Sequence, residues 1–148
     1  MKLFLKACLV AASAGLMATS CSDYKDDTPD NFPEAEKNLS GVWKLSSVTR
    51  NTVDITEAMD FSQFRLHLNG NGSYSLENPM PFPVGNEGKW EVDDPQHPYT
   101  LYFTESDALG KVEVEINYPI ILGERKLSIT HSPGCGSNSY VYLFERVK

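Results

Sequence analysis

Short runs in which apolar and polar side chains alternate fill most of the sequence after residue 40, and turn residues separate one run from the next. The clearest run is KVEVEINY at 111–118, where every second residue is Val, Val, Ile or Tyr. Successive side chains of a β-strand point to opposite faces, so this period of two predicts half-buried strands. Because Asn and Gly tolerate positive φ, NGNG at 69–72 predicts a tight turn between two strands. The pattern restricts the chain to an all-β fold.

Eight such runs predict an antiparallel meander, and closure into a barrel removes its exposed edges. We therefore expect an eight-stranded barrel; a flat sandwich of the same strands is the alternative. An eight-stranded barrel is just wide enough to be filled by side chains or to hold one small ligand. We expect a packed core, with a pocket as the alternative. The predicted lining is Phe64, Leu66, Tyr74, Trp90, Leu101 and Phe103, with Tyr99 on the face of Leu101, and Trp43, Leu45, Ser47 and Thr49 sharing one face of the first run.

One stretch favours a helix, DITEAMD at 54–60. Asp54 is an N-capping residue type, and Glu57 follows it at the spacing of a capping box. Three apolar side chains of this stretch would also share one helical face. We expect about two helical turns between the first and second strands.

The first twenty residues have the three parts of a secretory signal. Two lysines near the start precede an apolar run at 7–17, and small residues at 18–20 lead to Cys21. The apolar run is shorter than the roughly 20 residues that span a bilayer, which argues against a permanent transmembrane helix. We interpret 1–20 as a signal peptide.

The small residues at 18–20 resemble the lipobox of bacterial lipoproteins, with Ala18 where leucine is usual. The resemblance implies cleavage before Cys21 and attachment there of more than one acyl chain, which anchors a protein stably to a membrane. Residues that resemble the acidic export tag of Bacteroidetes lipoproteins follow: Ser22, Asp23, Asp26 and Asp27. This resemblance implies a lipid-anchored protein of the outer membrane at the cell surface, with the periplasmic leaflet as the alternative.

Residues 21–38 are predicted to form a disordered acidic tether, and 39–148 one folded domain. The segment 22–38 holds six acidic residues, two lysines and two prolines. Loss of the two lysines of the signal takes the formal charge from −7 to −9, which argues against nucleic acid as a partner. Of the three cysteines, only Cys135 lies beyond the signal and the lipid site, so no disulfide framework is expected.

Four motifs of the domain are similar to the lipocalin-like lipoproteins of Bacteroidetes, many of them of unknown function: GVW at 41–43, NGNGSYSL at 69–76, GKWEVDD at 88–94 and YVYLFERVK at 140–148. Gly-x-Trp at the start of the first strand also resembles lipocalins and other calycins. The resemblance implies a barrel in which Trp43 closes one end and Arg146 packs over it.

No group of residues predicts catalysis. Glu113 and Glu115 alternate with valine and isoleucine, which predicts a solvated face and not a catalytic pair of carboxylates. His131 and Cys135 have a spacing that would suit a metal, but no further ligand lies near them and structural zinc takes four. We expect no enzymatic activity, no cofactor and no metal.

The proline-rich connection NPMPFPVGNEG at 78–88 carries apolar side chains outside any predicted strand, namely Met80, Phe82 and Val84. Such side chains pack against their own domain or bind a partner. They are a candidate binding rim at the barrel mouth, near 54–60; a loop packed onto the barrel end is the alternative. Two functions follow as hypotheses. The barrel mouth binds a small apolar or glycan-like molecule, or the domain acts through protein contacts as an accessory subunit of an outer-membrane complex.

Overall fold

The structure, a computed structural model, describes residues 35–107, 109–134 and 136–148, and Glu34–Lys148 forms one compact unit. The described chain is built almost entirely from strands, which confirms the expected all-β fold. The strands are β1 (Gly41–Arg50), β2 (Val53–Asp54), β3 (Arg65–Leu68), β4 (Ser73–Glu77), β5 (Glu87–Val92), β6 (Thr100–Glu105), β7 (Lys111–Asn117), β8 (Ile120–Ile121), β9 (Glu124–His131) and β10 (Tyr140–Arg146).

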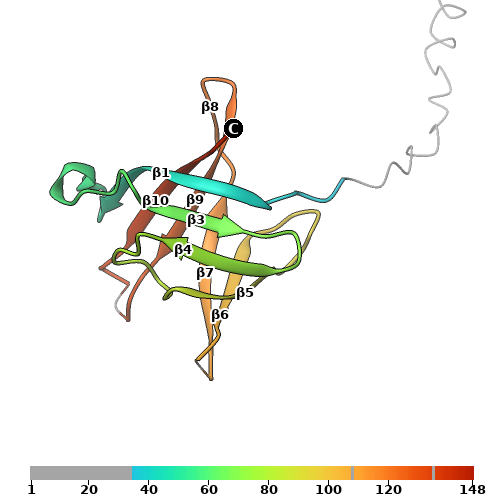
Figure 1. Cartoon of the computed structure of the whole chain (residues 1–148). Coiled ribbons are helices and arrows are strands. Elements are labelled where there is room, and N and C mark those ends of the chain that lie inside the picture. The colour runs from blue at the N-terminus through green and yellow to red at the C-terminus, as the bar shows by residue number, and fades with distance from the viewer. Residues whose placement is uncertain (1–34, 108, 135) are drawn as a thin grey trace, which may run out of the picture. The chain divides into compact units, whose positions relative to one another are not determined.

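Eight of the strands close into an antiparallel barrel (Figure 1). Their order is β1, β3, β4, β5, β6, β7, β9, β10, and the ring closes because β10 pairs with both β9 and β1. The two-residue strands lie outside the ring: β2 pairs with β1, and β8 pairs with β9. In Figure 1, β8 and the turn that follows it project beyond the barrel. The predicted meander barrel is confirmed, and its closure excludes the sandwich.

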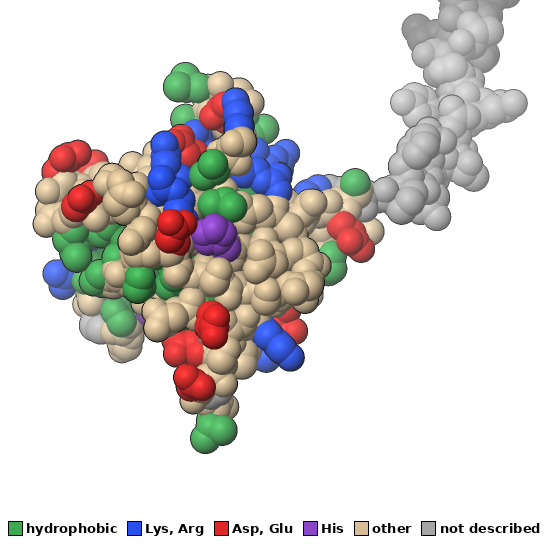
Figure 2. All heavy atoms as spheres, viewed as in Figure 1, with side chains coloured by type: hydrophobic (Ala, Val, Ile, Leu, Met, Phe, Trp, Pro, Cys, Tyr) green, Lys and Arg blue, Asp and Glu red, His purple; other side chains and the backbone are tan. Residues whose placement is uncertain are grey.

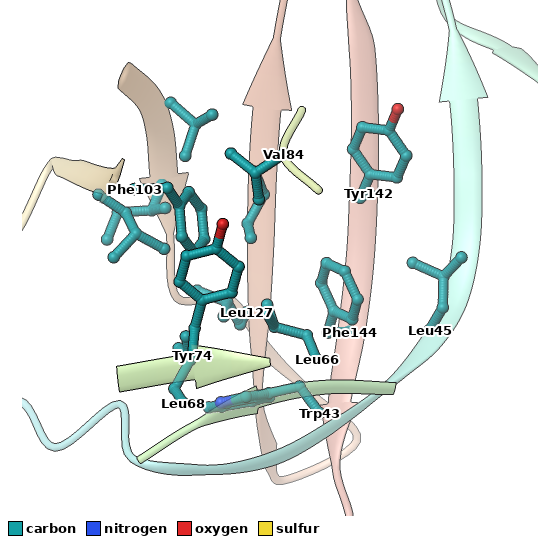
Figure 3. Close-up of a cluster of buried hydrophobic side chains, with 14 of the residues drawn as sticks. Trp43, Leu45, Leu66, Leu68, Tyr74, Val84, Phe103, Leu127, Tyr142 and Phe144 are labelled. Carbon is teal, nitrogen blue, oxygen red and sulfur yellow. The ribbon is translucent and has the colours of Figure 1, made fainter. Parts of the chain in front are cut away.

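Side chains fill the interior of the barrel. Figure 3 shows the cluster, with the Trp43 indole lying across one end and Val84 at the other. Of the predicted lining residues, Trp90 is half-buried and the rest are fully buried: Phe64, Leu66, Tyr74, Leu101 and Phe103. The remaining strands complete the core with Val114, Ile116, Leu127, Ile129, Tyr142 and Phe144. The interior is a packed core, as expected.

A β-bulge changes the inward face of β1. The pairing with β10 shifts register between Leu45 and Ser47, so Ser46 is an extra residue on this strand. An extra residue reverses the alternation beyond it. Val48 therefore points into the core and is buried, and the prediction that Ser47 and Thr49 share the face of Trp43 is wrong.

The predicted two-turn helix at 54–60 is a single 3-10 turn, Thr56–Ala58. Asp54 belongs to β2, and its Oδ1 accepts a hydrogen bond from the Thr56 amide at 2.8 Å. The Thr56 hydroxyl in turn accepts a hydrogen bond from the Val48 amide of β1 at 2.9 Å. These bonds tie the segment to the barrel wall, and the tertiary contacts override the local helical pattern.

The proline-rich segment 78–86 packs onto the end of the barrel opposite Trp43. The Phe82 ring contacts four aromatic rings at centroid distances of 5.2 to 6.2 Å: Phe64, Phe103, Tyr142 and Phe144. Val84 is 5% exposed, and Met80 packs against the same core. The Tyr142 hydroxyl donates to the Pro81 carbonyl at 3.2 Å, which holds the segment to β10. The described contacts of this segment are those of a plug for the barrel end.

Replacing Phe82 by alanine is expected to lower the free energy of unfolding by an amount near the lower end of the ~3–5 kcal/mol range for phenylalanine deletions, because the ring contacts four others but is only half-buried. Urea or thermal unfolding measures the change. Leu122→Ala is the control, since its side chain is 99% exposed and the change should stay within about 0.5 kcal/mol. Unaltered unfolding of Phe82→Ala would contradict the packing role and favour a free binding rim.

Candidate functional site

One end of the barrel is closed by a seam between the first and last strands. Trp43 and Arg146 are opposite each other in the β1–β10 pairing, and the Arg146 guanidinium lies over the indole, 5.7 Å from the ring centroid to Cζ. The Trp43 Nε1 donates to the Leu39 carbonyl at 2.9 Å, and Arg146 donates to the Ser40 carbonyl. The contact expected from the calycin resemblance is present.

Gly41 leaves room for this arginine. A Cβ at position 41 would lie 2.7 Å from Nε of Arg146, and the residue has a φ of +149°. A side chain would therefore collide with the guanidinium and strain the backbone. The two fixed residues of the Gly-x-Trp motif thus support the same contact. Gly41 leaves space for the Arg146 guanidinium, and the guanidinium packs on the Trp43 indole.

A hollow of about 340 Å³ lies beside this seam. Residues 35–39 form one wall, and the segment around β8 and β9 supplies Tyr118 and Arg125 on the other. A second hollow of about 230 Å³ shares Lys37 and Tyr118 with the first and continues to Tyr99. We call the two together the tryptophan-end cleft. The wall 35–39 is held in place because the Lys37 amide donates to the Pro95 carbonyl at 2.7 Å.

Tyr118 stands where the two hollows meet. Its hydroxyl oxygen is buried, and among the described residues it has no hydrogen-bond partner. Burial raises the pKa of this hydroxyl well above its usual value; the negative charge of Asp93 adds to the rise and the positive charge of Arg125 opposes it. A buried hydroxyl without a partner carries a desolvation cost that a bound acceptor would relieve.

The charged residues beside the cleft differ in their pairing. Glu145 and Glu124 bind the neighbouring lysines in a chain of ion pairs: Lys44–Glu145 at 2.7 Å, Lys126–Glu145 at 2.9 Å, Lys126–Glu124 at 3.4 Å and Lys148–Glu124 at 2.7 Å. Hydrogen bonds from Lys44 and Lys126 lower the pKa of Glu145 to about 2. Within the part of the chain that the structure describes, the side chain of Arg125 has neither a hydrogen bond nor an ion pair. In Figure 2, basic side chains gather around the projecting hairpin of β8 and β9.

A third hollow, of about 410 Å³, lies apart from the cleft on the side of the barrel, lined by Leu45, Ser46, Thr56, Glu57, Met59, Asp60, Phe61 and Ser62. Its polar groups are mostly occupied by local bonds. Thr56 bonds to β1, and Asp60 accepts from both the amide and the hydroxyl of Ser62, which lowers the pKa of the Asp60 carboxyl. We therefore place the candidate site in the tryptophan-end cleft, where the Tyr118 hydroxyl and the Arg125 guanidinium find no partner in the described part of the chain.

The family model described as Domain of unknown function (DUF5004) matches residues 19–145. The chain belongs to this family. Searches of curated proteins and of solved structures gave no match. The span matched by the DUF5004 model contains Trp43, Tyr118 and Arg125, and it ends one residue before Arg146.

The other residues of this DUF5004 chain that the sequence analysis proposed or rejected as site residues lie apart from the cleft or outside the described residues. Met80, Phe82 and Val84 contact the core at the opposite end. Glu113 and Glu115 are exposed on the outer face of β7. Residues that lie outside the described part are Cys21, Ser22, Asp23, Asp26, Asp27 and Cys135. Within the described ranges, no three His, Cys, Asp or Glu side chains form a metal-binding group, and no helix has the length and apolarity to cross a bilayer.

Sequence reasoning did not identify Tyr118, Arg125 or Lys37 as site residues. Tyr118 was predicted only as part of a strand face, and Arg125 belongs to a hairpin that no alternation signals. Tyr99 was expected to share the inward face of Leu101 but is 67% exposed at the mouth of the smaller hollow. The sequence of this DUF5004 chain offers one local signal for Tyr118 and Arg125, the segment YPIILGER at 118–125. In this segment an aromatic residue is followed by a short apolar turn and an arginine.

Gly41→Ala is expected to destabilise the domain by roughly 1–3 kcal/mol, because the new methyl group collides with Arg146 and the backbone conformation becomes strained. Urea unfolding measures the loss, with Gly110→Ala as control, since a Cβ there meets nothing within 4 Å. If the guanidinium causes the loss, Arg146→Ala should recover part of it in a double-mutant cycle. Strict additivity of the two changes would reject this account of the Gly-x-Trp motif.

Proposed function

We propose that this chain is a membrane-anchored, surface-exposed lipoprotein whose barrel is a non-catalytic module that binds a small glycan-like ligand in the tryptophan-end cleft. The observation that carries the proposal is the contrast between interior and cleft. The core is packed from Trp43 to Val84, whereas the cleft offers two adjoining hollows, with a buried Tyr118 hydroxyl and an Arg125 guanidinium that have no partner among the described residues. Ligand sites combine aromatic surface with a few polar groups that fix orientation.

A glycan-like ligand suits this cleft better than a purely apolar one. The Tyr99 ring is 67% exposed beside the smaller hollow of the cleft. Tyr118 lies between this smaller hollow and the larger hollow of the cleft. An aromatic ring of this kind offers an apolar face with a polar edge. The apolar face of a sugar ring would lie on such a surface while its hydroxyls meet Asn38, Arg125 and Tyr118, all of which line the larger hollow.

Titration of the purified chain with a panel of mono- and disaccharides tests this proposal. In ¹H–¹⁵N NMR spectra, the amides of residues 35–39, Tyr99 and 117–125 are expected to shift. Tyr99→Ala should weaken binding about tenfold, the loss of roughly 1.4 kcal/mol, without changing the melting temperature, because the ring is exposed. Tyr102→Ala on the outer face of β6 is the matched control and should bind normally. Shifts confined to the hollow around Thr56 and Phe61 would contradict the assignment.

The exposed hairpin favours a second candidate function, protein contacts within an outer-membrane complex. Ile120, Ile121 and Leu122 are 66%, 39% and 99% exposed, and Leu122 has a φ of +52°. A leucine rarely takes this conformation, and here it packs on nothing that would offset the strain. If the chain binds no saccharide in the titration, this hairpin becomes the better candidate for the functional surface.

The proposed anchor predicts a change of compartment. Cys21→Ala is expected to move the protein from the membrane fraction to the soluble fraction, because that residue carries the proposed lipid. Fractionation followed by immunoblotting measures the distribution. Cys135→Ala is the matched control and should stay in the membrane fraction. Membrane retention of Cys21→Ala would sink the lipoprotein assignment.

Replacement of Asp26 and Asp27 by alanine should reduce protease accessibility on whole cells while leaving the protein in the membrane fraction, if the acidic run is an export tag.

A further inference from the structure

We propose that the ligand of the tryptophan-end cleft carries an oxyanion, as an acidic sugar does in its carboxylate or sulfate, and that Arg125 and Tyr118 receive it. This inference rests on the proposed function of the cleft and names the chemical class of its ligand. It is carried by the electrostatics of the cleft wall in a protein that is otherwise acidic, with a formal net charge of −7.

Arg125 is the first observation. It lines the larger hollow from the start of β9, where it pairs with Ile120 of β8. The lysines nearby have carboxylate partners in Glu124 and Glu145, whereas Arg125 has none among the described residues. A guanidinium presents a planar fork of donors that matches a carboxylate or sulfate. Its free donors are therefore available to a ligand in the hollow.

The second, independent observation is the buried hydroxyl of Tyr118. Its hydroxyl is buried without a partner in the wall that both hollows share, and a tyrosine hydroxyl that stays protonated is a hydrogen-bond donor. Tyr74 has an unpartnered hydroxyl too, but it lies in the barrel core beneath Val84 (Figure 3) and lines neither hollow. Of these two described tyrosines, Tyr118 is therefore the one whose side chain borders the cleft, and a small rotation of its ring would present the hydroxyl to a ligand.

The remaining charges of the cleft also favour an anion. Arg146 and Lys37 line the larger hollow together with one acidic residue, Glu36. Arg146 donates to the Ser40 carbonyl, which leaves further N–H groups of its guanidinium for a ligand. Asp93 is the acidic neighbour of Tyr118, and its Oδ1 accepts from the amides of Tyr99 and Thr100 at 3.0 and 3.1 Å. The basic residues of the lining therefore outnumber the acidic one.

The experiment compares a neutral sugar with two acidic sugars that have the same glucose-type ring. The full chain is titrated by calorimetry with methyl glucoside, glucuronate and glucose 6-sulfate, and separately with acetate and inorganic sulfate. The acidic sugars are expected to bind at least tenfold more tightly than methyl glucoside, since hydrogen bonds to charged groups are the stronger ones. Because the guanidinium is exposed, raising the salt concentration from 0.05 to 0.5 M (a roughly threefold shorter Debye length) should weaken the acidic sugars and not the neutral one.

Two variants locate the effect. Arg125→Gln is expected to remove most of the preference for acidic sugars, whereas Lys89→Gln, which removes one positive charge from the exposed face of β5, should keep it. Tyr118→Phe should weaken binding of the acidic sugars several-fold while the melting temperature stays equal or rises, because the deleted hydroxyl has no partner to lose. Tyr74→Phe is the matched control: it also removes an orphaned hydroxyl, but it should leave binding unchanged.

Each outcome decides between the two proposals. Equal binding of neutral and acidic sugars would overturn the oxyanion inference and leave the glycan-binding function standing. Binding of acetate or inorganic sulfate as tight as that of the acidic sugars would keep the oxyanion site and overturn its glycan character. No binding of any ligand overturns both. A lower melting temperature in Tyr118→Phe would show that its hydroxyl supports the fold, which counts against a reserved donor.

Discussion

The interior of an eight-stranded barrel is narrow enough for side chains to fill, and the rest of this structure depends on how completely they do so. Aromatic rings from β6, β10, the residue before β3 and the proline-rich segment meet in one cluster, with Phe82 in contact with Phe64, Phe103, Tyr142 and Phe144. Each added ring stabilises the core and reduces the space inside the barrel for a ligand. Under the proposed function, a barrel packed in this way would have to bind its ligand outside the core, between its end and the segments that cover that end. The tryptophan-end cleft is such a place.

The strands of this barrel could be predicted because their signal is local. β7 alternates without interruption, so the pattern of Lys111–Asn117 reads directly as one buried and one exposed face. The same reasoning failed at Ser46, where one extra residue reverses the alternation and only the partner strand shows it. It failed again at 54–60, because the bonds that hold Thr56 to Val48 join residues of two different elements. Periodicity detects a strand but not the contacts that bend one.

The candidate site was harder to predict because its parts come from distant segments. Trp43 and Arg146 were paired only through a family resemblance, since nothing in the order of residues brings a first and a last strand together. Arg125 and Tyr118 were not identified from the sequence, because what distinguishes their side chains is the lack of a hydrogen-bond partner among the described residues. Hydrogen-bond satisfaction is a property of the folded chain. The acidic composition of the sequence also conceals a basic wall, which forms only when Lys37, Arg125 and Arg146, from three separate segments, line one hollow.

The pairing of β1 with β10 also sets the order in which the barrel can fold. Every other pair in the ring joins strands that follow one another along the chain, whereas Trp43 and Arg146 are about 100 residues apart. Local hairpins can form early, but β1 and β9 each keep an open edge until Tyr140–Arg146 arrives between them. A chain that is still being synthesised therefore stays open until its last strand is free. Loss of β10 would leave the backbone groups along one edge of β1 and one edge of β9 unpaired, and it would expose the Trp43 indole. Truncation at this end is therefore a route to aggregation.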